Sequence, residues 1–327
     1  MSRSVTLSPK TLNSLSPQAD GEYPASRGLH RFAVFTAAST FCLIVAGALV
    51  TSRDAGLSVP DWPLSYGRLM PEMIGGVFYE HGHRMIASFV GFLTIILAVW
   101  LWLGEQRRWV RNLGWVALGA VIAQGVLGGM TVLFLLPTAV SVAHACLAQL
   151  FFSATVVLAL VTSRSWNRPD MESQPRDPET GSPSLPALCV TANCAVFAQL
   201  LMGAALRHKG LGVIPHLAGA VVVAAVVFWL MARVARHYSG VPAIFSWTMA
   251  LNGLVMLQLV LGAGAYWIRE VTRDAVQPLW PMVGITVGHV ALGALILAVS
   301  VVLTFQVRHV LGRRHESLEP QGVPVTT

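Results

Sequence analysis

The sequence is short of charged residues. Only 11% of its 327 residues are Asp, Glu, Lys or Arg, whereas 54% are hydrophobic. A typical soluble domain carries about 25% charged residues, and the mean hydropathy of +0.63 points the same way. The shortage excludes an ordinary soluble domain and indicates an integral membrane protein.

Cysteine is scarce as well, with four residues in the whole chain. All four lie inside apolar runs, where a cysteine behaves as a small hydrophobic residue. Two of them are five residues apart, which is not a spacing typical of metal ligands. We therefore expect buried structural thiols at Cys42, Cys146, Cys189 and Cys194.

Apolar runs of about 20 residues mark membrane-spanning helices, and the sequence contains eight of them. The polar stretches between them are tails or loops, so no separate soluble domain is expected. The predicted fold class is an all-α integral membrane protein with eight transmembrane helices in two similar four-helix halves. The predicted helices are 31–52, 81–103, 112–133, 139–163, 186–206, 213–234, 243–267 and 282–307.

The polar stretches divide the chain into two halves joined by a linker. Residues 1–30 are rich in Ser, Thr and Pro and lack the pattern of a signal peptide, so they are predicted to be a disordered cytoplasmic tail. Residues 31–163 form the N-terminal half and 186–307 the C-terminal half. The proline-rich segment 164–185 is predicted to be a flexible cytoplasmic linker, and 308–327 a cytoplasmic tail.

The net charge of +7 reflects topology, and we expect no nucleic-acid partner. The two tails and the loops near 104–111, 164–185 and 233–240 hold 15 of the 22 Lys and Arg, whereas the other four loops hold six. Basic residues accumulate on the cytoplasmic side of a membrane protein. Both termini are therefore predicted to be cytoplasmic, with some attraction to anionic lipid.

A short motif repeats on alternate helices. Gln-x-x-x-Gly occurs three times, and each copy is followed by a helix with a histidine near its start. Such a repeat predicts two four-helix halves of similar structure, although small residues are also common wherever membrane helices pack closely. The copies are Gln124 with Gly128, Gln199 with Gly203, and Gln258 with Gly262.

Ionisable residues that are costly inside a membrane lie near the starts of four apolar runs. Glu80 and His83 open the second run, and His144, His216 and His289 lie near the starts of the fourth, sixth and eighth runs. With a cytoplasmic N-terminus, all four histidines lie near the outer face. Two histidines in each half can bracket a flat ligand such as haem, whose iron takes two axial imidazoles. Zinc usually requires three or four ligands close together.

These sites also have simpler interpretations. A lone histidine in a membrane is often a hydrogen-bonding contact between helices, but four in the same register are harder to explain in this way. Glu80 at a helix start can complement the helix dipole. Arg84 can extend to the membrane interface, and Trp62 and Tyr66 suit the same position.

The motifs together resemble the haem A synthases over about residues 30–310. The resemblance rests on Glu80-x-x-His83-Arg84, on Gly-Leu-Ser-x-Pro-Asp-Trp-Pro-Leu-x-Tyr-Gly at 56–67, on Gln-x-x-Leu-Gly-Gly at 124–129, and on the four histidines. It implies a bundle of eight helices in two similar halves, located in the inner (plasma) membrane. It also implies an oxidoreductase that converts a ring methyl group of haem O into a formyl group, giving haem A for terminal oxidases.

The resemblance implies a role for each candidate residue. His216 and His289 would be the axial ligands of a resident haem b, the cofactor. His83 and His144 would hold the substrate, haem O, with Glu80 as the catalytic residue that accepts protons or stabilises positive charge. Arg84 is a candidate partner for the haem propionates.

The resemblance leaves several points open. A haem O synthase and an electron donor are the expected partners, and a homo-oligomer is compatible with the sequence. Many relatives carry a cysteine pair in the first external loop, where this chain has Val59 and Ser65, so no disulfide can form there. Two other classes also fit the histidines: a membrane b-type cytochrome that only transfers electrons, and a haem transporter or chaperone.

The charge distribution generates a topological prediction. A reporter enzyme that works only in the cytoplasm should be active when fused to the C-terminal tail, because the cytoplasmic segments hold the larger share of Lys and Arg. Activity of a reporter that works only outside the cytoplasm would contradict this orientation. Every proposed site would then move to the opposite face of the membrane.

Overall fold

The computed structural model describes residues 26–167, 182–276 and 278–318, with side chains described as far as residue 312. Within these ranges the chain folds into eight long helices and one short helix. They are α2 (Arg27–Ser52), α3 (Gly75–Gly104), α4 (Arg108–Leu133), α5 (Thr138–Val161), α6 (Arg164–Asn167), α7 (Leu185–Arg207), α8 (Val213–His237), α9 (Pro242–Val271) and α10 (Trp280–Leu318).

The eight long helices correspond one to one with the eight predicted spans. Each is long and apolar enough to cross a membrane. A helix satisfies its backbone hydrogen bonds internally, which a chain inside lipid requires. The predicted fold class, an all-α integral membrane protein, is confirmed, and the chain is a multi-pass membrane protein.

Buried hydroxyl groups follow the same requirement. Six Ser and Thr side chains on the buried faces of the helices each donate a hydrogen bond of 2.7–2.9 Å to the carbonyl oxygen four residues earlier. Because this bond is local, a hydroxyl can be buried without a partner on another helix. The residues are Thr36, Thr40, Thr94, Ser153, Thr248 and Thr304.

Two helices are clearly longer than predicted. α3 begins at Gly75 rather than at 81, because hydrogen bonds from the preceding loop allow the polar side chains of Glu80 and His81 to be buried inside a helix. α10 continues to Leu318, past its predicted end at 307, since a helix that has left the membrane needs no apolar sequence. The predicted C-terminal tail therefore starts as helix.

The predicted tails and linker lie largely outside the described residues. Of the predicted N-terminal tail only 26–30 are described, and Ser26 caps α2 by accepting a hydrogen bond from the Leu29 N–H at 3.3 Å. Of the predicted linker, 168–181 is not described. The short helix α6 precedes this segment, and α7 follows it.

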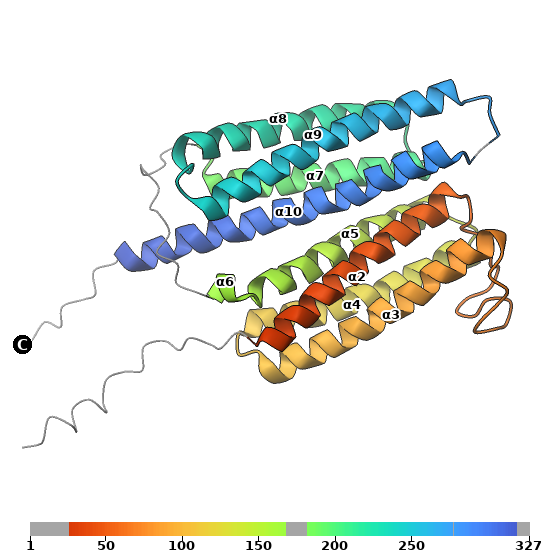
Figure 1. Ribbon diagram of the computed structural model, residues 1–327, viewed down its shortest axis with the longest axis horizontal. Coiled ribbons are helices and arrows are strands. Elements are labelled where there is room, and N and C mark those ends of the chain that lie inside the picture. Colours follow the sequence, from red (N-terminus) through yellow and green to blue (C-terminus); the bar gives the residue numbers. More distant parts are fainter. Residues whose placement is uncertain (1–25, 168–181, 277, 319–327) are drawn as a thin grey trace, which may run out of the picture.

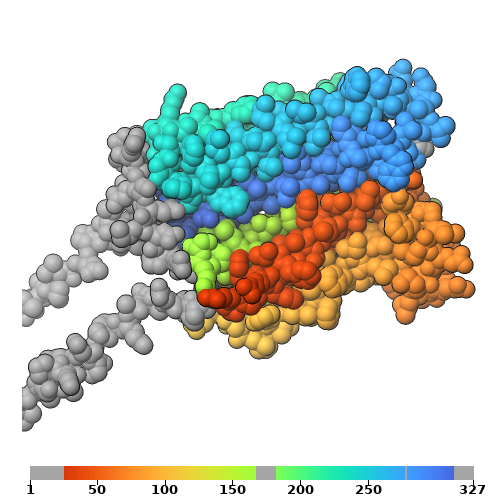
Figure 2. All heavy atoms as spheres, in the orientation of Figure 1, coloured from red at the N-terminus to blue at the C-terminus, as the bar shows by residue number. Residues whose placement is uncertain are grey.

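The long helices form two groups (Figure 1). α2, α3, α4 and α5 contact one another in a ring, and α7, α8, α9 and α10 do the same. The groups meet where α10 contacts α2 and α5, and where α5 contacts α7. Figure 2 shows α10 lying beside α2 along the seam between the groups. This arrangement is compatible with the two predicted halves.

Small residues allow the two groups to approach closely. A core cluster at the seam joins Ile44 of α2 and Phe152 of α5 to Ala294 and Ala298 of α10. Both alanines are almost completely buried, so the helix backbones come together at this point. Such close packing is how membrane helices associate without a hydrophobic driving force.

The expectation of four buried thiols is wrong for two of them. Cys146 and Cys189 are buried, but Cys42 and Cys194 are exposed on the outward faces of α2 and α7. All four are free thiols. An apolar run therefore showed that these cysteines are in the membrane, but not which face of the helix they occupy.

Candidate functional site

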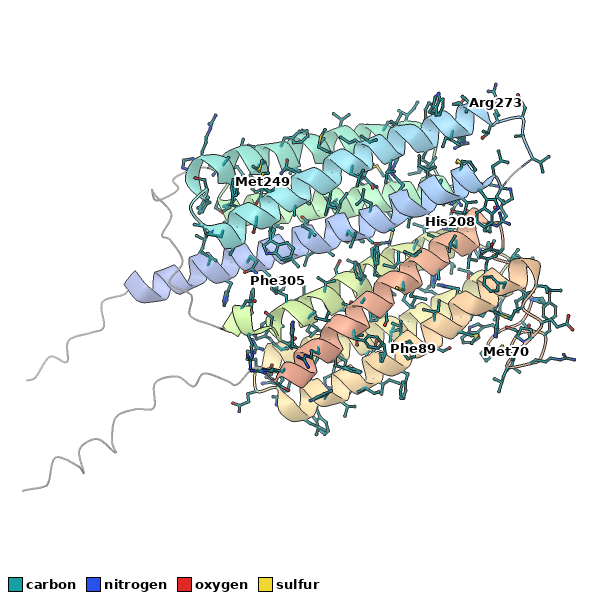
Figure 3. All side chains as sticks on the ribbon, viewed as in Figure 1. Met70, Phe89, His208, Met249, Arg273 and Phe305 are labelled. Carbon is teal, nitrogen blue, oxygen red and sulfur yellow. The ribbon has the colours of Figure 1, made fainter. Side chains whose placement is uncertain are left out.

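The loops that precede the histidine-bearing helices meet at one end of the bundle. Figure 3 shows Met70 of the first external loop, His208 after α7 and Arg273 after α9 at this same end. The helices α3, α5, α8 and α10 all start here (Figure 1). We call it the outer end, following the predicted topology.

Each of the four histidines lies against a glycine of the preceding long helix. A Cβ atom added to that glycine would lie only 3.0–3.4 Å from the Cε1 atom of the imidazole. The imidazole therefore occupies space that a side chain would otherwise fill. The pairs are Gly47 with His83, Gly128 with His144, Gly203 with His216, and Gly262 with His289.

This contact explains the Gln-x-x-x-Gly repeat. Three of the four glycines belong to the repeat, and its glycine provides the surface on which the next helix places its histidine. The fourth glycine, Gly47, was missed because Leu43 stands where the repeat has glutamine. A search for a glycine near the end of the helix before each histidine would have found it.

The C-terminal pair is already arranged as two axial ligands would be. The ring centroids of His216 and His289 are 6.2 Å apart, with an angle of 70° between the planes. Two metal–nitrogen bonds of about 2 Å each, plus the distance from each nitrogen to its ring centre, span roughly 6 Å. The separation of the two rings is therefore similar to that of two imidazoles bound to one iron.

A glutamine contacts each histidine of this pair. Gln199 Nε2 donates to the backbone carbonyl of His216 at 2.9 Å and lies 3.1 Å from His216 Nδ1. Gln258 Nε2 donates to the carbonyl of His289 at 3.1 Å and lies 3.3 Å from its Nε2. Each amide therefore links the preceding helix to the backbone of the histidine and lies against its ring. Sequence reasoning found both glutamines but gave them no role.

The N-terminal pair is held differently. His83 and His144 are close enough to interact electrostatically. In each ring Nδ1 is buried and has no hydrogen-bond partner in the described part of the chain. The structure brings together the two histidines that were expected to hold a ligand, and each ring has a nitrogen without a partner.

Glu80 lies next to this pair, but its carboxylate already has protein partners. Its side chain is 5% exposed. One oxygen accepts a hydrogen bond of 2.9 Å from the Val59 N–H, and the other forms an ion pair of 2.6 Å with Arg84. Both oxygens of the carboxylate are therefore engaged, one with the loop and the other with Arg84.

Arg84 ties the first external loop to α3. Besides its ion pair with Glu80, its Nη1 donates to the carbonyl oxygens of Asp61 at 2.8 Å and Leu64 at 2.9 Å. A guanidinium group with its donors in a fixed fork is suited to such multiple contacts. Arg84 is therefore engaged with the loop, which weakens its candidacy as a partner for haem propionates.

His81 contacts the same loop. Its side chain is buried, and its Nδ1 lies 2.8 Å from the Ser65 hydroxyl. Val59 and Ser65, the two loop positions without cysteine, thus contact Glu80 and His81. In place of a disulfide, hydrogen bonds hold these two positions to one turn of α3.

The loop is also organised internally. The carboxylate of Asp61 accepts hydrogen bonds from the N–H groups of Gly67 at 2.8 Å and Tyr66 at 2.7 Å. The Gly67 N–H in particular lowers the pKa of Asp61 below its usual value. Trp62 packs directly on Gly129 of α4, where an added Cβ would lie 2.7 Å from the indole. The loop therefore spans from α3 to α4 as a cover over the N-terminal group of helices.

The described residues contain no cluster of three or more His, Cys, Asp or Glu side chains that could hold a bare metal ion. Each of the four histidines lies against a glycine, and the rings of His216 and His289 lie next to each other. This chemistry fits an iron that already carries four equatorial ligands, as haem iron does.

Comparison with known proteins supports the same family. A family model described as cytochrome oxidase assembly protein, COX15-CtaA, matches residues 30–313. The match covers all eight long helices and both histidine pairs.

Several curated relatives match part of the chain, and all three described here are named Heme A synthase. The protein of Lysinibacillus sphaericus is 32% identical over 42% of this chain and 45% of its own. That of Symbiobacterium thermophilum is 32% identical over 53% of this chain and 58% of its own. That of Halalkalibacterium halodurans is 29% identical over 56% of this chain and 60% of its own. The chain thus spans about half the length of the curated relatives it matches.

The loop contacts generate a prediction about local stability. Replacing Arg84 with Met removes the charge partner of a buried carboxylate, a change that costs about 3–5 kcal/mol. Amide hydrogens of the loop around Val59 and Tyr66 should then exchange at least a hundredfold faster, as measured by hydrogen exchange with mass spectrometry. The matched control is Arg68→Met, because Arg68 is exposed in the same loop. Equal exchange in both variants would contradict a holding role for Arg84.

Proposed function

Because the chain belongs to the COX15-CtaA family of cytochrome oxidase assembly proteins, we propose that it is a haem A synthase. In this proposal it oxidises a ring methyl group of haem O to a formyl group. The observation that carries the proposal is the set of four histidines, each set against a glycine and arranged as two pairs. The names of the partial relatives support the same activity.

The C-terminal half, 186–307, would hold the resident cofactor, haem b. His216 and His289 would be its axial ligands, with Gln199 and Gln258 fixing the orientation of the two rings. When bound, this haem supplies one-electron transfer. The 6.2 Å separation of the rings supports this assignment over a role in helix contacts alone.

The N-terminal half, 31–163, would hold the substrate. His83 and His144 would bind the iron of haem O, and the covering loop would exclude water from the reacting methyl group. Excluding water strengthens every electrostatic interaction in the site. The positions of His83 on α3 and of the loop contacts on the same helix support this arrangement.

Glu80 would be the catalytic residue. Protons must leave as the methyl group is oxidised, and Glu80 lies one turn from His83. Its carboxylate can take such a proton at the oxygen that Val59 now contacts, if the loop moves. It can also stabilise developing positive charge while it stays paired with Arg84.

The setting of the reaction follows from the membrane topology. We propose that both termini are cytoplasmic, that the site lies near the outer face of the plasma membrane, and that 1–30, 164–185 and 308–327 are cytoplasmic segments. A haem O synthase would supply the substrate, and a separate electron-transfer partner would complete the oxidation. A homo-oligomer is also compatible with the extensive apolar surface of the helices.

Pigment analysis tests the proposal. The chain would be expressed with a haem O synthase in a host that makes no haem A, and the extracted haems would be identified by mass. Haem A is the expected result. Unchanged haem b bound to the protein would instead indicate a cytochrome that only transfers electrons, and absence of any retained haem would indicate a transporter or chaperone.

The glycine contacts generate a prediction about the resident haem. In Gly262→Ala the new Cβ would lie 3.1 Å from His289 Cε1, so the imidazole must shift. Overpacking of this kind costs about 1–3 kcal/mol, so we expect roughly five- to hundredfold weaker haem binding and loss of the low-spin absorption spectrum. Gly253→Ala is the matched control on α9, because nothing lies within 4 Å of its added Cβ. A normal spectrum in Gly262→Ala would contradict the assignment.

Glu80 generates the prediction about catalysis. Glu80→Gln should keep the resident haem and still bind haem O, but should make roughly a hundredfold less haem A or stop at a partly oxidised product. Haem products would be quantified by mass after co-expression. Full haem A production by this variant would show that the carboxylate is not needed.

A control separates chemistry from loop anchoring. Glu80→Gln and Arg84→Met both weaken the attachment of the loop to α3. The two variants are compared by their haem A production and by the rate of hydrogen exchange in the loop. If Glu80 is catalytic, Glu80→Gln should lower haem A production far more than Arg84→Met for the same increase in the exchange rate. Equal losses in the two variants would assign Glu80 a structural role.

A further inference from the structure

Arg53, at the outer end of α2, takes part in none of the contacts described above. Arg53 follows the last residue of α2, and its guanidinium lies between two aromatic rings. The carbon at its centre is 4.5 Å from the ring centroid of Trp280, the first residue of α10, and 5.4 Å from that of Tyr79 on α3. The guanidinium of Arg53 thus contacts one aromatic ring from each group of helices.

The charge of Arg53 is not balanced by the protein. Its Nε is buried and has no hydrogen-bond partner. Among the residues whose side chains are described, no carboxylate lies within ion-pair distance of it. Its neighbour Asp54 interacts electrostatically with Arg207 of α7. A buried donor of Arg53 therefore remains without an acceptor, which is costly.

The space beside this cation is open. Arg53 lines a cavity of about 430 Å³ together with Met73, Gly75, Gly76 and Tyr79, among others. Gly75 leaves part of the wall open, because nothing lies within 4 Å of a Cβ added there. A cavity with one cationic group and aromatic sides is suited to a ligand with a negative group and an apolar body.

The cavity lies on the outer side of the N-terminal histidine pair. His83 lies against Gly47, and Arg53 is six residues further along α2 toward the outer end, or about 9 Å along the helix axis. This is a distance that the edge of a porphyrin ring can cover when its iron is near His83. Haem carries two propionate carboxylates on one edge.

We propose that Arg53 binds a propionate carboxylate of the haem held by His83 and His144. The inference rests on the proposed function, and adds to it the residue that fixes which edge of the substrate faces outward. Arg84 is the other arginine near this site, but its guanidinium is occupied by Glu80 and the loop carbonyls. The carboxylate would accept the hydrogen bond that Arg53 Nε lacks, while Trp280 and Tyr79 hold the guanidinium in place.

A second arginine, Arg207, links the two groups of helices at the outer end. His208, labelled in Figure 3, lies in the same outer region. It is half-buried, and burial and then Arg207 lower its pKa, so it adds little positive charge near neutral pH. Arg207 itself donates to the Ser52 hydroxyl at 3.1 Å, directly before Arg53. Arg53 Nε, by contrast, has no hydrogen-bond partner in the described part of the chain.

Esterified haem tests the proposal with a readout other than activity. The full-length protein in detergent would be titrated with haem b and with its dimethyl ester, in which both carboxylates are uncharged, and binding would be followed by absorbance. His83→Ala identifies the binding phase that belongs to this site. The wild type should bind the free acid more tightly than the ester.

The variants then locate the carboxylate. Arg53→Gln should weaken binding of the free acid roughly ten- to hundredfold, the range expected for a charged hydrogen bond, and should leave ester binding unchanged. Arg68→Gln, an exposed arginine of the neighbouring loop, should match the wild type. Equal losses for acid and ester in Arg53→Gln would show a structural role and overturn the proposal, as would unchanged acid binding.

Two further outcomes show whether Arg53 binds a lipid phosphate instead of a haem propionate, and whether the proposed haem site exists at all. Bound phosphatidylglycerol would be measured by native mass spectrometry. If Arg53→Gln loses this lipid while its preference for the free acid persists, Arg53 binds a lipid phosphate and the proposal is wrong. If the wild type shows no binding phase that depends on His83, the proposed haem site itself fails, and the inference fails with it.

Discussion

The structure depends on the close approach of an imidazole to a helix backbone that carries no side chain. A histidine inside a membrane is costly unless it has a partner, and a ring is too large to fit between two helices that both carry side chains at the contact. Glycine on the preceding helix removes this conflict four times, at Gly47, Gly128, Gly203 and Gly262. The helix spacing, the direction of each ring and the pairing of His216 with His289 all follow from these contacts.

A second constraint acts on the N-terminal group alone. Burying Glu80 and Arg84 near the membrane boundary requires that each satisfy the other, because an unpaired buried charge is strongly destabilising. Their partners in the loop, Val59, Asp61 and Leu64, are thereby held against α3. The same helix carries His83, so the loop and this histidine are positioned by one rigid element.

The two groups of helices share a plan and differ in how they treat their histidines. In the C-terminal group, glutamines contact both rings. In the N-terminal group, Leu43 stands at one of the equivalent positions, and the nearby polar groups belong to a loop.

The sequence by itself determined the eight membrane helices, the repeat and the four histidines, because run length, motif spacing and cost of burial are properties of short segments. It misjudged the start of α3 and the exposure of Cys42 and Cys194. Only the tertiary structure paired each histidine with its glycine, tied the loop to Glu80 and Arg84, and set Arg53 between Tyr79 and Trp280. These contacts join residues on different helices, and which of them meet depends on how the helices rotate and pack, which no single segment encodes.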